Sequence, residues 1–259
     1  MNQEERRVYL IQYLLNEESQ YEDISIPHNA LDQKKLLRAL MNVRIPKSIS
    51  SQFITVQDEY LKEEIQSKGI VSIDDLDEIQ KDLYVWQGDI TTLQCDAIVN
   101  AANSQMLGCF CPNHGCIDNA IHTYAGIQLR LKMNEIMSSQ QTLEETGKAK
   151  ITPAYNLPCQ YILHTVGPIV RGVVTDKDKA DLKNCYTSCL ELAEKTGLKS
   201  IAFCCISTGE FHFPNDLAAK IAIETVKEYK RKTSSEMKVI FNVFKSLDKQ
   251  IYTDLLGSD

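Results

Sequence analysis

One segment near the middle of the chain carries most of the residue types that do chemistry. From Gln87 to Gly126 it reads QGDITTLQCDAIVNAANSQMLGCFCPNHGCIDNAIHTYAG. It contains an acidic turn, an Asn-rich strand end, a cluster of Cys and His residues, and the pair Asp118 and His122. Core packing does not require this combination. We therefore take the segment as the candidate active site and ask which elements position it.

The cluster of thiols and imidazole is the most specific signal in this segment. Its members are Cys109, Cys111, His114 and Cys116. Thiolate and imidazole ligands suit Zn²⁺, and three such ligands with an open fourth position are typical of a catalytic zinc site. Gly108, Pro112 and Gly115 favour a tight loop that can wrap a metal. On the residues alone, a closed structural zinc site using all four side chains, or a loop with coincidental cysteines, remains open.

The elements around this segment alternate between strands and helices. Apolar runs predict strands at 83–86, 97–99, 161–164, 201–206 and 239–244. Amphipathic stripes predict helices over 182–193, ending at Gly197, and over 217–229, entered through Pro214. Such alternation predicts an α/β fold with a parallel or mixed sheet and helices on both of its faces.

Three loops follow predicted strands directly, at 88–90, 100–103 and 207–211. In open α/β sheets, ligands bind beyond the carboxyl ends of the strands. The loop 207–211 offers hydroxyls, a Gly and backbone N–H groups, which suit a diphosphate. Asp89 could accept a hydrogen bond from an exocyclic amine such as that of adenine, and Asn100 and Asn103 could bind sugar hydroxyls. Ordinary turn chemistry explains the same residues equally well.

The first part of the chain, residues 1–80, is predicted to be a helical extension without chemistry of its own. Apolar stripes near 8–15, 36–41 and 53–65 indicate amphipathic helices, and 72–75 resembles a capping box opening a short further helix. Since no flexible linker follows, we expect this extension to pack on the main domain, residues 81–259.

Composition limits the partners of the protein. The 259 residues include 28 basic and 35 acidic ones, a net charge of −7, which argues against a nucleic-acid backbone as partner. The charged start and the lack of a long apolar run indicate a cytoplasmic protein without a membrane partner. Its nine Cys should then be thiols or metal ligands. The apolar stripes place five of them in the core: Cys95, Cys185, Cys189, Cys204 and Cys205. His122 and His164 are interpreted as packed, structural residues.

Taken in order, the motifs of residues 83–250 resemble those of a macrodomain, the three-layer α/β/α fold with a mixed central sheet that binds ADP-ribose. The motifs are GDIT at 88–91, DAIVNAAN at 96–103, IDNAIH at 117–122, HTVGP at 164–168 and STGEFHFP at 207–214. Hydrolytic macrodomains usually have a glycine-rich loop before the IDNAIH segment, and GCFCPNHGC stands in its place here. This resembles the zinc-containing macrodomain branch of bacteria and fungi, which also has a helical N-terminal extension.

The resemblance implies a metal site and an activity. It maps the ligands of a Zn²⁺ cofactor onto Cys109, His114 and Cys116 and leaves Cys111 unbound. It implies a hydrolase that removes single ADP-ribose units from Asp or Glu side chains of proteins, with Asn103 and Asp118 as catalytic residues. The residues implied to bind ADP-ribose are Asp89, Ile90, Asn103, Ser207, Thr208, Gly209, Glu210 and Phe211.

The resemblance also suggests partners and leaves alternatives. In this branch the modified protein is often a lipoyl carrier protein of the glycine-cleavage H type, modified by a sirtuin-like transferase. The alternatives are a reader module that binds ADP-ribose without catalysis, and an enzyme acting on O-acetyl-ADP-ribose. Glu210 and His212 depart from the family pattern, and Glu210 is unfavourable beside a diphosphate unless it points outward.

Overall fold

A seven-stranded mixed sheet forms the centre of the computed structural model, which describes residues 1–257. The strand order is β2-β3-β9-β8-β5-β7-β6. The edge strands β2 and β6 run antiparallel to their neighbours, and the inner strands pair in parallel. The strands are β2 (Glu78–Gln80), β3 (Leu83–Gln87), β5 (Ala97–Ala102), β6 (Ala149–Pro153), β7 (Tyr161–Val166), β8 (Ser200–Phe203) and β9 (Lys238–Val243). The predicted α/β class with a mixed sheet is confirmed.

The inner strands are mostly apolar because both faces of the sheet are covered. Ile98 of β5, Ile201 of β8 and Ile240 of β9 are fully buried. Burying each such side chain contributes about 1.5–3 kcal/mol. The run predicted as a strand over 201–206 is a strand only to Phe203, since the next residues leave the sheet to enter the loop at 207–211.

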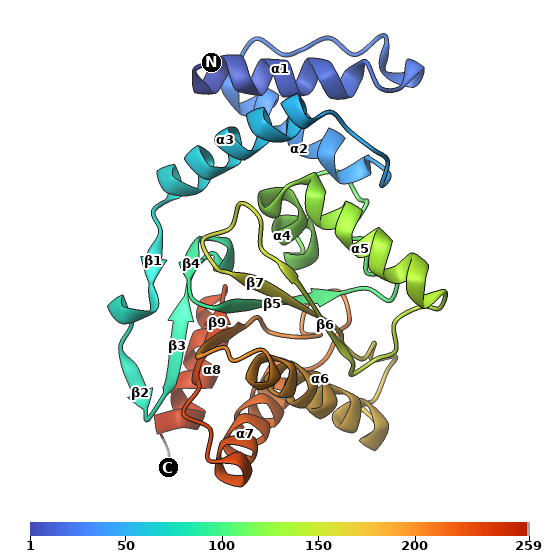
Figure 1. The fold of residues 1–259 in the computed structure, drawn as a ribbon. Coiled ribbons are helices and arrows are strands. Elements are labelled where there is room, and N and C mark those ends of the chain that lie inside the picture. The colour runs from blue at the N-terminus through green and yellow to red at the C-terminus, as the bar shows by residue number, and fades with distance from the viewer. Residues whose placement is uncertain (258–259) are drawn as a thin grey trace.

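Helices cover the two faces of the sheet and complete the predicted three layers (Figure 1). On one face lie α4 (Ile117–Ala125) and α5 (Ile127–Gln140), and on the other lie α6 (Asp176–Lys195) and α7 (Asn215–Thr233). The helix α8 (Ser246–Gly257) packs beside α7 and contacts β3 and β9. The predicted stripe of α6 is buried, including Leu182, Cys185 and Leu190. Thr175 and Asp178 form a capping box at its start, which satisfies backbone N–H groups there.

Three helices at the N-terminus form a second hydrophobic cluster above α4 and α5 (Figure 1). They are α1 (Gln3–Leu15), α2 (Ala30–Val43) and α3 (Ser51–Lys68), and Gly69 ends α3 with a positive φ of 88°. The cluster includes Leu10 and Phe53 and also Ile127 of α5, so the extension shares apolar contacts with the main body. Fully buried Gln57 of α3 accepts the N–H of Ile127 at 3.0 Å, which satisfies a donor at the start of α5.

Residues 71–80 attach to the sheets rather than to the helical cluster. A short strand β1 (Val71–Ser72) pairs in parallel with β4 (Leu93–Gln94), and β2 joins the main sheet. Between them, the capping box of Ser72 and Asp75 opens a single 3₁₀ turn over Ile73–Asp75. Two further 3₁₀ turns are Ser19–Tyr21 and Ile90–Thr92.

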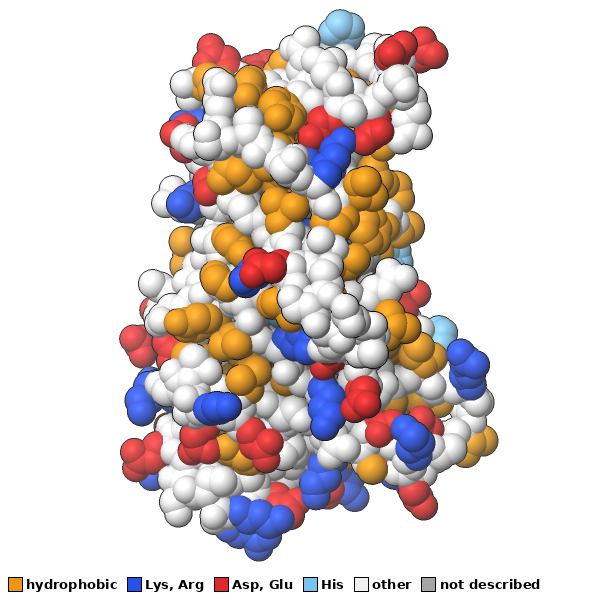
Figure 2. Space-filling view, turned by 45° about the vertical axis from the view of Figure 1, so that its right-hand side comes forward, with side chains coloured by type: hydrophobic (Ala, Val, Ile, Leu, Met, Phe, Trp, Pro, Cys, Tyr) orange, Lys and Arg blue, Asp and Glu red, His pale blue; other side chains and the backbone are white. Residues whose placement is uncertain are grey.

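Charged side chains of both signs lie on the face of the molecule drawn in Figure 2. Basic and acidic side chains are interspersed there, without a concentrated basic patch. Within residues 1–257, no helix is both long and apolar enough to cross a lipid bilayer.

Candidate functional site

A cavity of about 800 Å³ opens at the carboxyl ends of the inner strands. Strand β5 pairs with β7 from Ala97 to Ala102 but with β8 only at Ala97 and Ile98. The two strands β5 and β8 therefore part toward their carboxyl ends, which is where ligands bind in open α/β sheets. The cavity is lined by all residues predicted to bind ADP-ribose or metal and by Asp118. Its volume suits a ligand of nucleotide size.

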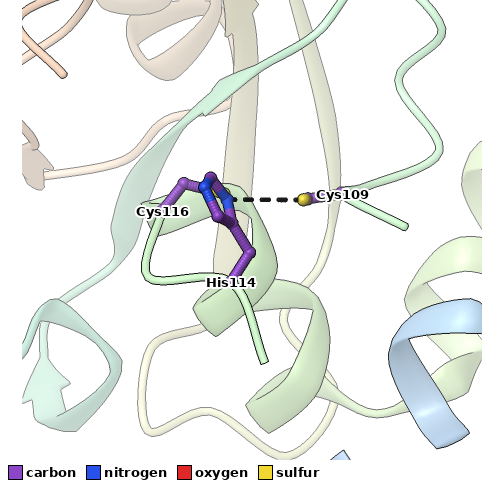
Figure 3. A group of neighbouring side chains, drawn as sticks. All are labelled: Cys109, His114 and Cys116. Carbon is purple, nitrogen blue, oxygen red and sulfur yellow. Dashed lines mark hydrogen bonds between the residues drawn. The ribbon is translucent and has the colours of Figure 1, made fainter. Parts of the chain in front are cut away.

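The segment between β5 and α4 contains a loop, residues 107–116, that we call the metal loop. It brings one ligand atom each of Cys109, His114 and Cys116 within 4.8 Å of one another. Figure 3 shows the sulfur of Cys109 facing the ring of His114, and the Sγ–Nδ1 distance is 3.6 Å. Cys116 caps α4 by accepting the N–H of Asn119 at 3.4 Å.

These side chains fit a zinc ion. Two thiols and one imidazole are a donor set that suits Zn²⁺, and the three residues face a cavity that leaves room for a fourth ligand. Cys111 is exposed and lies outside this group. Burial raises the pKa of the Cys116 thiol to about 12, and a bound cation reverses such a preference by favouring the thiolate. The geometry thus favours an open three-ligand site over a closed site using all four side chains.

Asp118 lies at the floor of the cavity, directly after the metal loop. Its carboxylate accepts from Asn100 Nδ2 at 2.8 Å and from Asn103 Nδ2 at 3.4 Å. Burial raises the pKa of Asp118 to about 6, although the bond from Asn100 and the charge of Arg130 act in the opposite direction. The two Asn side chains fix the orientation of a carboxylate that can accept a proton near neutral pH.

Two buried histidines lie near this carboxylate. His122 is in contact with Asp118, and His164 is in contact with Asn100. His164 Nδ1 lies 3.2 Å from Asn100 Nδ2 and its Nε2 lies 2.9 Å from Thr152 Oγ1. Because the amide nitrogen can only donate, Nδ1 accepts and Nε2 carries the proton. Burial lowers the pKa of His164 to about 3. Burial also lowers the pKa of His122, with smaller contributions from His164 and Arg130, and its Nε2 lies 3.6 Å from Asp118 Oδ1.

Asp89, which also lines the cavity, is held in place by hydrogen bonds from Thr91 and Lys68. Its Oδ1 accepts from the N–H of Thr91 at 3.0 Å and from the Thr91 hydroxyl at 2.6 Å, and its Oδ2 accepts from Lys68 at 2.8 Å. Burial alone would raise the pKa of Asp89, but the bonds from Lys68 and Thr91 lower it. Lys68 also lies 3.4 Å from the ring centre of Tyr124. Ile90 is buried at the wall of the cavity beside Asp89.

The loop 207–211 offers donors to an anion. Within residues 1–257, the backbone N–H groups of Gly209, Glu210 and Phe211 donate to no oxygen, and the Ser207 hydroxyl is buried without a partner. Ser207 adopts a left-handed φ of 65°. A Cβ at Gly167 would lie 2.0 Å from the Ser207 oxygen, so only glycine allows this approach. Free N–H groups in a loop of this kind suit a diphosphate.

Several residues of the cavity could not be identified from the sequence. Arg38 and Lys68 of the helical extension line it, and so does Phe244, whose ring is largely exposed after β9. Cys205, predicted to be a core residue, is only half-buried and also lines the cavity. Glu210, implied by the resemblance to bind ADP-ribose, points its carboxylate toward His114, with 3.6 Å between Oε1 and Nε2.

Comparison with known sequences identifies the family. A model of the macro domain matches residues 99–222. A protein-ADP-ribose hydrolase of Treponema medium is 55% identical over 261 residues, covering 99% of this chain and 100% of the relative. The chain belongs to the macro domain family. A protein-ADP-ribose hydrolase of Staphylococcus aureus strain MRSA252 is 48% identical over 256 residues, covering 98% of this macro domain protein and 96% of the relative.

Solved macrodomain structures with ADP or ADP-ribose share this fold. The Oceanobacillus iheyensis macrodomain with ADP has 34% identity and a TM-score of 0.63, over 71% of this chain and 94% of that one. The Trypanosoma brucei macrodomain in complex with ADP-ribose has 29% identity and a TM-score of 0.66, over 85% of this chain and 95% of that one.

The buried histidine beside the site predicts acid sensitivity. His164 stays neutral in the folded protein down to a pKa of about 3, whereas the unfolded chain takes up the proton near the ordinary pKa of 6.5. Acid therefore favours the unfolded state, and the free energy of unfolding should fall by about 1.4 kcal/mol for each pH unit below that value from this group alone. In His164→Asn this loss should be absent. Urea unfolding from about pH 7 to about pH 5 measures both slopes, and equal slopes would contradict the assignment.

Proposed function

We propose that the protein is a zinc-dependent hydrolase that removes single ADP-ribose units from Asp and Glu side chains of proteins. The observation that carries this proposal is that the three-ligand group of the metal loop and the buried carboxylate of Asp118 line one cavity. Two relatives that match this chain over nearly their whole length are named protein-ADP-ribose hydrolase, and they support the reaction class. The macrodomain structures with ADP and ADP-ribose support the ligand.

The proposed ligand extends across the cavity from Asp89 to the metal loop. The carboxylate of Asp89, which Thr91 and Lys68 hold in place, accepts a hydrogen bond from the exocyclic amine of adenine. The diphosphate lies against the N–H groups of 209–211, where a helix or loop of free donors binds anions. The distal ribose then reaches Asn103 and Asp118, beside the metal loop.

The reaction breaks the bond between C1 of the distal ribose and the carboxylate of the modified side chain. A water oxygen forms the new bond to C1, Asp118 accepts a proton of that water, and the side chain leaves as a free carboxylate. Asn103 positions the ribose and Asn100 keeps Asp118 oriented. Cys109, His114 and Cys116 would hold a zinc ion, which would supply a Lewis acid to this reaction.

A carboxylate is a good leaving group and needs no strong general acid. Asn103 and the three proposed metal ligands line the same cavity as Asp118, and this set suits a carboxylate leaving group better than the poorer ones of serine or arginine linkages. For the modified protein, we retain the proposal of a lipoyl carrier protein of the glycine-cleavage H type, modified by a sirtuin-like transferase. That partner derives from the family resemblance alone.

The metal assignment predicts the zinc content of single variants. Cys116→Ala should lose the metal because it removes one of the three ligands that line the cavity. Cys111→Ala is the matched control and should keep one zinc per chain, since the Cys111 side chain is exposed and lies outside the group. Elemental analysis of the purified proteins measures this. Full occupancy in Cys116→Ala would refute the ligand set, and loss in Cys111→Ala would favour the closed structural site.

Kinetics of two carboxylate variants separate catalysis from binding. Asp118→Asn should lower single-turnover release of ADP-ribose by about 10²–10⁴-fold and leave the affinity for free ADP-ribose near that of the wild type. Asp89→Ala should instead weaken binding by about 10–100-fold, the loss of one charge-assisted hydrogen bond. Glu-linked, Ser-linked and Arg-linked ADP-ribosylated proteins are the substrates, and release is expected from the first alone. If the wild type releases nothing from the Glu-linked protein but binds ADP-ribose, it is a reader.

A further inference from the structure

The helical extension contacts the metal loop through the side chain of Arg38. This residue of α2 donates from Nη2 to the backbone oxygen of His114 at 3.0 Å. Its Nε and Nη2 also donate to Asn119 Oδ1, at 3.1 and 2.8 Å. Asn119 is fully buried and donates in turn to the backbone oxygen of Cys111 at 3.0 Å. One guanidinium thus fixes the backbone of the loop at one predicted ligand and, through Asn119, at a second point.

A second residue of α2, Asn42, holds the outer turn of the loop. Its Oδ1 accepts the N–H of Asn113 at 3.0 Å, next to the ligand His114. Asn113 has a left-handed φ of 54°. This conformation costs energy and persists only where the surrounding structure fixes it. The Nδ2 of Asn42 donates to Thr123 of α4 at 3.0 Å, and Asn42 is 1% exposed. The same amide therefore joins the loop, α2 and α4.

The start of the loop is tied to α2 by Arg130 of α5. Its Nε donates to the backbone oxygen of Leu107 at 2.7 Å. Its Nη1 donates to three backbone oxygens at the end of α2, those of Met41, Asn42 and Arg44, at 3.1, 2.8 and 2.6 Å. A cation is favourable at a helix C-terminus, and the Arg130 side chain there is only 5% exposed. The metal loop and the end of α2 are thereby fixed relative to each other.

We infer that Arg38 and Asn42 are positioning residues of the metal loop, so that the helical extension is a structural part of the metal site. The inference rests on the zinc site of the proposed function. An irregular loop that is free to change shape must be ordered when the metal binds, and that cost weakens binding. Contacts that fix ligands from outside the coordination sphere commonly change metal affinity by about 10–100-fold. Arg38 acts on the ligands through the backbone of His114 and through Asn119, without contributing a ligand atom.

The test measures zinc affinity of full-length variants by competition with a chromophoric chelator. Arg38→Met keeps an unbranched apolar stem without the guanidinium and should bind zinc about 10–100-fold more weakly than the wild type. Arg38→Lys retains one charged donor and should recover part of the loss. Arg6→Met is the matched control, because Arg6 of α1 contacts Glu59 and Glu63 of α3 and Gln3 of α1, all within the extension. It should bind zinc as the wild type does.

Two further readouts distinguish a positioning role from a loss of stability and from a direct ligand contact. The melting temperature of the zinc-free protein reports any general loss of stability, which Arg6→Met should share. Because Arg38 also lines the cavity, the affinity of the zinc-free protein for ADP-ribose is measured as well, and a loss of that affinity in Arg38→Met would assign the side chain to the ligand rather than to the loop. Equal zinc affinity of wild type and Arg38→Met would overturn the inference and leave the zinc site intact. A wild type that binds no zinc would instead refute the proposed function.

Discussion

The metal loop has no regular secondary structure, yet it must hold three ligand atoms within 4.8 Å of one another. Buried or half-buried backbone groups of such a loop need hydrogen-bond partners, because a helix or sheet does not supply them. Here the partners are side chains: Arg130 for Leu107, Asn119 for Cys111, Asn42 for Asn113 and Arg38 for His114. The architecture above the sheet depends on this requirement, since these side chains come from α2, α4 and α5.

A second constraint is the burial of Asp118 under the same loop. A carboxylate that is 4% exposed is costly unless polar groups surround it. Asn100 and Asn103 supply those groups from the end of β5, and His164 fixes Asn100 from β7. Gly108 allows the loop to lie against His122, because a Cβ there would come within 2.6 Å of its ring. The sheet thus orients the carboxylate, and the loop above it leaves one open side, toward the cavity.

Much of this arrangement could be predicted from the sequence, because its signals are local. The inner strands are mostly apolar segments, and Cys109, His114, Cys116 and Asp118 lie within one short segment. The edge strand β6 and the helix α8 were not predicted, since their half-buried patterns carry weaker periodicity. Arg38 could not be assigned because its partner Asn119 is 81 residues away. The apolar stripe of α2 shows which face of the helix is buried. It does not show which group elsewhere in the fold pairs with a polar side chain beside that face, such as Arg38.

The role of Glu210 likewise depends on tertiary contacts. The sequence shows a carboxylate in a loop suited to a diphosphate, which is unfavourable. In the fold its side chain is mostly exposed and faces His114 Nε2, away from the nitrogen that faces Cys109. In the proposed zinc site, a carboxylate that faces the second nitrogen of the imidazole would orient the ring. The loop 207–211 and the metal loop meet at this contact.

The most direct test of zinc-dependent hydrolysis removes the metal and returns it. Wild-type protein is stripped with a chelator and divided, and one half is reloaded with zinc. Single-turnover release of ADP-ribose from a Glu-linked protein and the affinity for free ADP-ribose are then measured for both halves. We predict that release is lost without zinc and restored with it, while the affinity stays nearly constant, because Asp89 and the loop 207–211 are unaffected. Equal release by the stripped and reloaded protein would contradict a role for zinc in the reaction.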